Sequence, residues 1–214
     1  MPETETPSTP AKKKRFSMLR EFAAADWLTL ANGFCGAGSI LAAMQYTATQ
    51  DNGYLRTAMA LLPAALFFDF ADGRVARWRR RSSMLGADLD SLADVISFGM
   101  APAALAFAVG MRASLDVAVL LYFVACGISR LARFNATADQ MADDSGKVPY
   151  FEGTPIPTSV LLVGILAWLS SRDQLGETMV FGLWDLGPAA LHPLTLMYFL
   201  SGSLMISTIH VPKI

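Results

Sequence analysis

Four aspartates stand at helical spacing in two apolar stretches of the sequence. Asp69 and Asp72 are three residues apart, and Asp90 and Asp94 are four residues apart. On an α-helix, either spacing places both side chains of a pair on one face. Carboxylates inside apolar helices are energetically expensive, so they normally face the interior of a bundle and mark a functional site. We therefore expect the two pairs to converge from two antiparallel helices, joined by a short basic turn.

The chemistry open to such a cluster follows from its charge. Four carboxylates in a region of low dielectric cannot all remain ionised without positive counter-charge. Either some of them are protonated or cations bind among them. Oxygen ligands with no nearby His or Cys favour hard ions such as Mg²⁺, Mn²⁺ or Ca²⁺. Two such ions are a standard means of clamping a phosphate that undergoes displacement.

Small and basic residues accompany the aspartates. Gly73 and Ala76 leave little side-chain bulk, so a nucleotide can approach the backbone between them. Arg77 lies one turn beyond Gly73, where it can meet a phosphate oxygen. Gly86 shares a helix face with Asp90, one turn before it. These neighbours favour a site for a phosphate-bearing ligand.

The aspartates also have two simpler interpretations. They could form ion pairs with Arg74, Arg77 and Arg79, or they could serve as an ion path in a cation or proton transporter. Four aspartates in helical register with glycines between them are unusual for ion pairs alone. The transporter interpretation is weakened by the small size of the chain and by the gathering of all four aspartates near one side of the membrane.

Composition indicates a membrane protein with a single domain. The chain has 214 residues, of which 53% are hydrophobic and 16% are charged, against about 25% charged in soluble domains. Its net charge of −1 argues against a nucleic-acid-binding protein. We expect Cys35 and Cys126 to be reduced packing residues. His192 and His210 have no partner at ligand spacing, which argues against a zinc site.

We predict an all-α membrane protein with six transmembrane helices in one bundle, occupying residues 26–214. Positive residues gather on the side of the N-terminus, which the positive-inside rule places in the cytoplasm. Residues 1–11 are expected to form a disordered tail. Residues 12–25 suit a short amphipathic helix at the membrane surface, or only a basic flank that sets the topology. The predicted spans are 27–47, 56–77, 87–110, 115–134, 156–170 and 189–208, the fifth being short.

The sequence predicts a structure for one of two connections between the predicted spans and not for the other. Pro155 and Pro157 should keep the chain extended before the fifth span, because proline disfavours helix in the residue before it. The loop 171–188 on the other side of the membrane carries no motif from which a structure can be predicted.

The residues from Asp69 to Asp94 complete the pattern D-x2-D-G-x2-A-R-x8-G-x3-D-x3-D without a substitution. This long, specific pattern resembles the signature of the CDP-alcohol phosphotransferase family. The resemblance implies a six-helix membrane fold, usually dimeric, and a CDP-lipid substrate. It implies that Asp94 activates the acceptor hydroxyl as a base. It also implies two divalent cations, Mg²⁺ or Mn²⁺, held by Asp69, Asp72, Asp90 and Asp94, beside a CDP-lipid site that includes Asn32, Asp72, Gly73, Ala76, Arg77 and Gly86.

A narrower resemblance covers nearly the whole chain after residue 25. The chain resembles the family members that use L-serine, in particular the membrane-embedded type found in many bacteria and in fungi. It implies CDP-diacylglycerol and L-serine as substrates, CMP as a product, and a bacterial inner membrane or endoplasmic reticulum location. Thr154 departs from the pattern, where leucine is expected. The similar segments are 32–36, 67–70, 89–99, 130–135 and 151–157.

The residues that would bind the acceptor lie at the end of the fourth span. Arg130 and Arg133 are three residues apart and are followed by Asn135. A guanidinium there can bind a carboxylate through two hydrogen bonds, which suits serine. Glycerol 3-phosphate or inositol phosphate would suit the arginines equally, and anchoring of the helix at lipid headgroups is a third interpretation. Asn32, early in the first span, contacts either the cytidine or a neighbouring helix.

Overall fold

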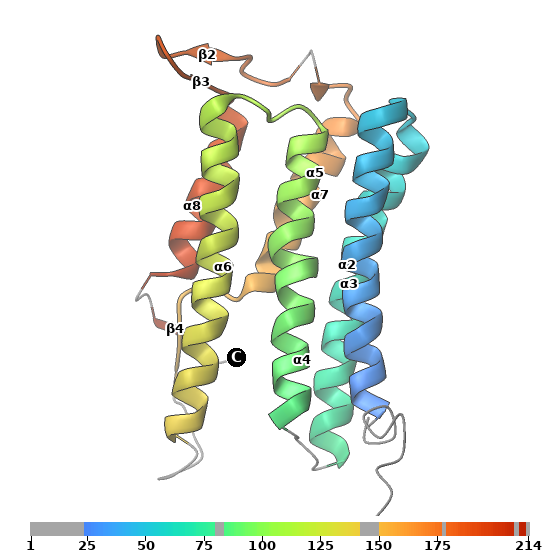
Figure 1. Cartoon of the computed structure of the whole chain (residues 1–214), viewed down its shortest axis with the longest axis vertical. Helices are drawn as coiled ribbons and strands as arrows, with labels where there is room; N and C mark the ends of the chain where they lie inside the picture. Colours follow the sequence, from blue (N-terminus) through green and yellow to red (C-terminus); the bar gives the residue numbers. More distant parts are fainter. Residues whose placement is uncertain (1–23, 80–83, 142–149, 177–178, 208–209, 213–214) are drawn as a thin grey trace, which may run out of the picture.

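A computed structural model describes residues 24–79, 84–141, 150–176, 179–207 and 210–212. These residues form a bundle of helices with two short strand pairs (Figure 1). The predominantly helical architecture confirms the predicted class. The predicted tail at 1–11 and nearly all of the predicted amphipathic helix at 12–25 lie outside the described residues.

Four of the described helices are long and apolar enough to cross a membrane. The third of them is one continuous rod, in which a π-helical segment joins two α-helices. Each helix includes most of a predicted span and extends beyond at least one of its ends. The helices are α2 (Ala24–Thr49), α3 (Asn52–Arg79), the rod α4–η1–α5 (Met84–Asp94, Val95–Met100 and Ala101–Ala108) and α6 (Ser114–Met141).

Two further apolar helices are shorter than the roughly 20 residues that a span needs. A 3₁₀ turn, η2 (Ile156–Ser159), leads into α7 (Val160–Ser170), which matches the fifth predicted span. Another, η4 (Pro193–Thr195), leads into α8 (Leu196–Met205). The structure thus establishes four helices of spanning length, and the count of six spans stays a prediction.

The chain before η2 is extended, as the two prolines predicted. Pro155 has φ −62° and ψ 143°. In Figure 1, η2 starts about half-way up the bundle rather than at its lower end, where α2 begins and α3 ends. Gly153 has φ +71° and lies against the end of α8, where a Cβ atom would stand 3.0 Å from the carbonyl oxygen of Leu204. The Thr154 N–H donates to the same carbonyl at 3.2 Å. This contact holds the extended segment against the end of α8.

We call the two ends of the bundle lower and upper, as in Figure 1. The lower end is where α2 and α4 begin and α3 and α6 end. At the upper end, α2 turns into α3 through Gln50, which has φ 56°, and the carboxylate of Asp51 accepts the Gly53 N–H at 2.7 Å. Both aspartate pairs therefore belong to the lower half of the bundle.

Close packing of α2 against its neighbours determines the arrangement of the lower end. α2 packs along α3 and also along the rod formed by α4, η1 and α5. Gly36 permits the second contact, because a Cβ atom there would lie 2.6 Å from the Cα atom of Ser97. α2 is thus wedged beside both helices that carry the aspartates.

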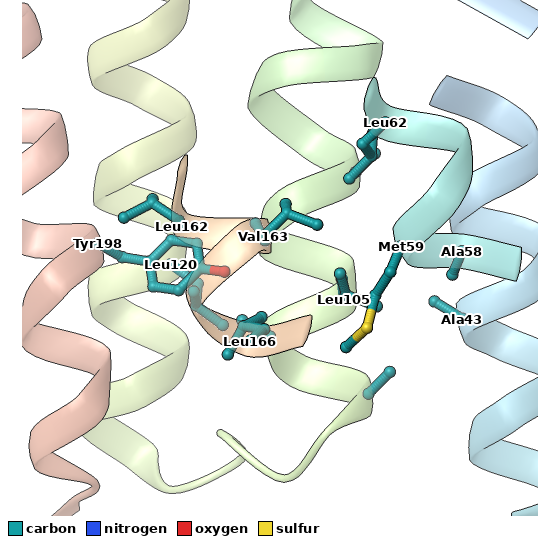
Figure 2. Packing of buried hydrophobic residues seen from close by; sticks show 14 of the residues in the cluster. Ala43, Ala58, Met59, Leu62, Leu105, Leu120, Leu162, Val163, Leu166 and Tyr198 are labelled. Atoms are coloured by element: carbon teal, nitrogen blue, oxygen red, sulfur yellow. The ribbon is translucent and has the colours of Figure 1, made fainter. Parts of the chain in front are cut away.

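The apolar core lies higher in the bundle, around α7. Tyr198 of α8 is fully buried and donates a hydrogen bond from its hydroxyl to the Pro102 carbonyl at 3.1 Å. The core therefore ties α8 to α5 across the bundle. Figure 2 shows Leu162, Val163 and Leu166 of α7 among Met59 and Leu62 of α3, Leu105 of α5, Leu120 of α6 and Tyr198.

The upper end is closed by a buried aspartate that the sequence analysis did not single out. Asp116, in the first turn of α6, accepts hydrogen bonds from the His192 backbone N–H at 2.8 Å and from the Thr195 hydroxyl at 2.8 Å. The Nδ1 atom of His192 also lies 2.6 Å from the Asp116 carboxylate. These bonds fasten the start of α8 to the start of α6.

Two strand pairs complete the fold, and neither was predicted. The loop 171–188 leads into a hairpin of β2 (Trp184–Asp185) and β3 (Ala190–Leu191) at the upper end. Because β3 takes up residues 190–191, α8 starts later than the predicted sixth span. Near the lower half, β1 (Tyr150–Glu152) pairs antiparallel with β4 (His210–Pro212).

Candidate active site

Three of the four predicted metal ligands meet in the structure. Carboxylate oxygens of Asp69, Asp72 and Asp90 all lie within 4.8 Å of one another. Asp69 and Asp90 are half-buried, and Asp72 is buried. Asp94 follows Asp90 one turn further along the same helix and is also buried, but it lies outside this group of three. The two helices therefore bring their aspartates together, as the spacing predicted.

Two side chains of α2 hold the buried aspartates. The Thr29 hydroxyl donates to Oδ2 of Asp72 at 2.8 Å, and Nδ2 of Asn32 donates to Oδ1 of Asp94 at 3.1 Å. Thr29 and Asn32 are three residues apart, so they share one face of α2. Each bond holds one carboxylate oxygen of its aspartate in a fixed direction.

A π-helical segment begins directly after Asp94. Residues Val95–Met100 carry an extra residue per turn, a feature often found at functional sites. Within it, the Ser97 hydroxyl donates to the backbone carbonyl of Asn32 at 2.9 Å. Ser97 therefore fixes the backbone of the residue whose amide bonds to Asp94. The hydrogen bonds run from Ser97 through Asn32 to Asp94.

Three buried polar atoms around the aspartates have no hydrogen-bond partner among the described residues. They are Oδ1 of Asn32, Oδ1 of Asp90 and Nε of Arg130. Buried polar atoms are nearly always satisfied in folded proteins, so these atoms call for a partner such as an ion or a water molecule. An unpaired carboxylate oxygen in an all-oxygen donor set fits a hard divalent cation. The residues present are therefore compatible with the predicted Mg²⁺ or Mn²⁺.

The predicted acceptor residues differ in their surroundings. Arg130 is half-buried, within electrostatic range of Asp94. Asn135 is tied to α4, because its Nδ2 donates to the Ser91 hydroxyl at 2.9 Å. Arg133 is exposed and makes a contact of its own. Arg130 is thus the acceptor candidate that the structure brings to the aspartates.

The remaining predicted ligand contacts lie at the lower ends of α3 and α4. Gly73 and Gly86 are half-buried, and Gly86 makes a further contact. Ala76 and Arg77 belong to the last turns of α3, but their side chains lie outside the described part of the structure. Their predicted contacts with a CDP-lipid stay predictions.

Comparison with known proteins identifies the family. The sequence pattern of the CDP-alcohol phosphatidyltransferases matches residues 22–199. The chain belongs to this family. The match includes all four aspartates together with Thr29, Asn32 and Arg130, so the membership covers the whole candidate site.

Within the family, the similar curated proteins share one name. The chain is 44% identical to a CDP-diacylglycerol–serine O-phosphatidyltransferase of Saccharomyces cerevisiae over 202 residues, which are 92% of this chain and 73% of that protein. Proteins of that name in Bacillus subtilis and Mycobacterium bovis are 31% and 38% identical. These matches cover 66% and 61% of this chain, and 73% and 46% of the relatives. The chain thus spans less than half the length of the mycobacterial protein.

The sequence analysis missed the polar residues that support the aspartates. Thr29, Ser91 and Ser97 were not singled out, because an isolated hydroxyl in an apolar helix usually bonds to its own backbone. Their partners here are 43, 44 and 65 residues away. One signal was available: Thr29 and Asn32 repeat the three-residue spacing of Asp69 and Asp72.

The bond between Asn32 and Asp94 leads to a test of the two interpretations of Asn32. Asn32→Ala removes a buried hydrogen bond worth about 1 kcal/mol or more. We expect kcat at saturating substrate to fall about tenfold, because Asp94 loses its fixed orientation, with little change in KM for the CDP-lipid. A raised KM with unchanged kcat would instead mean that Asn32 contacts the cytidine. Ser39→Ala is the matched control, since it removes a buried bond from α2 to the Ala58 carbonyl.

Proposed function

We propose that the chain is a phosphatidylserine synthase, which transfers the phosphatidyl group of CDP-diacylglycerol to L-serine and releases CMP. The observation that carries the proposal is the half-buried Arg130 beside an aspartate cluster in a family member. The name shared by the yeast, mycobacterial and Bacillus relatives supports serine as the acceptor.

The aspartate cluster is proposed to hold two divalent cations, Mg²⁺ or Mn²⁺. Asp69, Asp72 and Asp90 would provide the oxygen ligands that lie together, and Asp94 would contribute from the adjacent turn. When bound, the cations would neutralise the diphosphate of the CDP-lipid and stabilise the charge that develops on CMP. Thr29 would keep one oxygen of Asp72 occupied and so limit the directions from which that carboxylate binds.

The acceptor is proposed to lie between Asp94 and Arg130. Arg130 would bind the serine carboxylate through its guanidinium, whose Nε has no other partner among the described residues. Asp94 would take the proton of the serine hydroxyl. The serine oxygen would then form a bond to the phosphorus distal to cytidine, as the bond from that phosphorus to CMP breaks. Positioning and electrostatics would supply most of the rate enhancement.

The orientation in the membrane follows from the positive-inside rule. We propose six spans, with α7 and α8 completing the four long helices, and with the lower end in the cytoplasm. The CDP-lipid would keep its acyl chains in the bilayer and its cytidine toward the cytoplasm. A homodimer in a bacterial inner membrane or in the endoplasmic reticulum belongs to the same proposal, on family resemblance.

The experiment that tests the proposal is CMP release from CDP-diacylglycerol by the detergent-purified chain. L-serine, glycerol 3-phosphate and inositol phosphate are each added with Mn²⁺, Mg²⁺ or EDTA. The proposal predicts release that needs both L-serine and a divalent cation, with phosphatidylserine formed in equal amount. Release with another acceptor would leave the proposed cation site standing and would refute L-serine as the acceptor. If protein shown to be folded released no CMP with any acceptor, the proposed enzymatic function would be refuted.

The role of Arg130 has its own expected result. Arg130→Gln should raise KM for L-serine about tenfold or more, because a hydrogen bond to a charged group contributes about 1.5–3 kcal/mol. KM for CDP-diacylglycerol should change little. Arg112→Gln is the control, since Arg112 lies at the other end of the bundle and donates to the Phe107 and Ala108 carbonyls. An equal rise in both KM values for Arg130→Gln would contradict a specific contact with the acceptor.

A further inference from the structure

A pocket of about 500 Å³ lies at the upper end of the bundle, opposite the aspartates. It is formed where the end of α2, the first two turns of α3 and the end of α7 meet, together with the turn that follows α7. None of its lining residues belongs to the candidate active site. Its position and its lining residues indicate a second binding site of a different kind.

The polarity of the pocket changes with depth along α3. Asn52 lies at the upper rim, Arg56 one turn below it, and Met59 and Ala60 one turn below that. The rise from Asn52 to Ala60 is about 12 Å. On α7 the same change runs from Ser171 and Ser170 at the rim to Ala167 below. The pocket is therefore polar toward the upper end of the bundle and more apolar toward its middle.

The polar part of the pocket contains hydrogen-bond donors without protein partners. Within the described residues, the side chains of Tyr46, Asn52, Arg56 and Ser170 make no hydrogen bond or ion pair. A guanidinium, an amide and two hydroxyls that line one pocket suit the oxygens of a phosphate. The donor set thus favours a phosphate-bearing ligand.

Arg56 differs from the other arginines of the upper end. Arg112 donates to the Phe107 and Ala108 carbonyls at 2.9 and 3.0 Å, and Arg172 lies 5.3 Å from the centre of the Trp168 ring. Each is held against the end of the helix that precedes it. Arg56 is exposed, has no such contact among the described residues and lines the pocket. Its guanidinium is therefore available to a ligand.

The apolar wall distinguishes a lipid from a free anion. Arg56 lies one turn from the start of the span-length segment Asn52–Val75, and so near one end of that candidate span. Below it, Met59, Ala60 and Ala167 continue the pocket with a surface that an acyl chain would cover. Asp173 at the rim already has an interaction of its own, and its charge opposes a free anion while tolerating a zwitterionic headgroup.

We propose that this pocket binds one phospholipid of the leaflet opposite the active site, with its phosphate at Arg56 and an acyl chain along Met59, Ala60 and Ala167. The ligand is a structural or regulatory lipid rather than the substrate, because the aspartates lie at the other end of the bundle. The proposal does not depend on the reaction assigned to the aspartates.

The test uses a phosphatidylcholine with a photoactivatable diazirine in one acyl chain, added to the detergent-purified full chain. Cross-linked residues are mapped by mass spectrometry in the wild type, in Arg56→Gln and in the control Arg112→Gln. We expect adducts in segments 46–60 and 167–175 to fall about tenfold in Arg56→Gln, the loss of one charged hydrogen-bond donor to phosphate. The control should label like the wild type. Unlabelled phosphatidylcholine should compete, whereas inorganic phosphate and glycerophosphocholine at millimolar concentration should not.

Two results would overturn the proposal. Equal labelling of the wild type and a folded Arg56→Gln variant would mean that the pocket holds only bulk lipid. Full competition by inorganic phosphate would mean a site for a free anion. Thermal unfolding midpoints show whether each variant is folded. If Arg56→Gln does not fold, Arg56→Lys, which keeps the charge but loses the planar fork, must show reduced labelling for the proposal to stand.

Discussion

Replacing Asp94 with asparagine is expected to lower the rate of CMP release about 10²- to 10⁴-fold, the usual contribution of a general base. Asparagine has nearly the same shape as aspartate and can still accept the hydrogen bond from Asn32. In the wild type this bond is 3.1 Å long. It cannot take the proton of the acceptor hydroxyl. The loss should therefore appear in kcat, with small changes in both KM values, and is measured by steady-state CMP release.

The Asp94→Asn variant distinguishes a role of Asp94 as the base from a role of Asp94 as a metal ligand. Because Asp94 lies outside the group formed by Asp69, Asp72 and Asp90, Mn²⁺ should still bind to the variant. A variant with full activity would refute the role of Asp94 as the base. A variant that loses Mn²⁺ binding completely would instead make Asp94 chiefly a ligand, as the family resemblance also implies.

Asp90→Asn is expected to have the second large effect, through the cation site. The Oδ1 atom of Asp90 is buried without a partner among the described residues, and Asp90 belongs to the group of three carboxylates. Its loss removes one charge and weakens cation binding, so activity at fixed Mn²⁺ should fall about a hundredfold or more. Raising the Mn²⁺ concentration should restore part of it, which a titration of activity against Mn²⁺ would measure.

The same helix offers a matched control for Asp90. Asp88 lies two residues earlier and is exposed, so Asp88→Asn makes the same charge change away from the cluster. We expect Asp88→Asn to keep the activity and Mn²⁺ dependence of the wild type. Equal losses in the two variants would mean that total negative charge, rather than a defined ligand, controls the activity.

The convergence of the aspartates could be predicted because it depends on local geometry. The spacings of Asp69 with Asp72 and of Asp90 with Asp94 determine which residues share a helix face. A short turn then leaves few ways to pack the two helices. A second local rule predicted the extended chain before η2, because proline disfavours helix in the residue before it, and Pro155 itself is extended.

The support of the aspartates could not be predicted from such local rules. The wedged position of α2 depends on Gly36 meeting Ser97, a contact between residues 61 positions apart in the sequence. Neither residue type indicates a partner. The bond from Thr29 to Asp72 depends on that packing in turn, and the bond from Asn135 to Ser91 depends on the packing of α6 against α4.

The loop at the upper end shows a different limit. Its hairpin is two residues long in each strand, too short for an alternating pattern. Asp116 and His192, which hold the loop to α6, are 76 residues apart, and neither stands in a recognisable motif. Sequence patterns identify regular elements, whereas these contacts exist only after the helices have packed.

Direct measurement of bound Mn²⁺ tests the central claim, that the aspartates form a divalent-cation site. Electron paramagnetic resonance of the detergent-purified chain counts free and bound Mn²⁺ without relying on turnover. The account predicts two Mn²⁺ ions per chain in the presence of CDP-diacylglycerol, and loss of both in a variant carrying Asp69→Asn and Asp90→Asn. The same Mn²⁺ binding by the wild type and by that folded double variant would contradict the account.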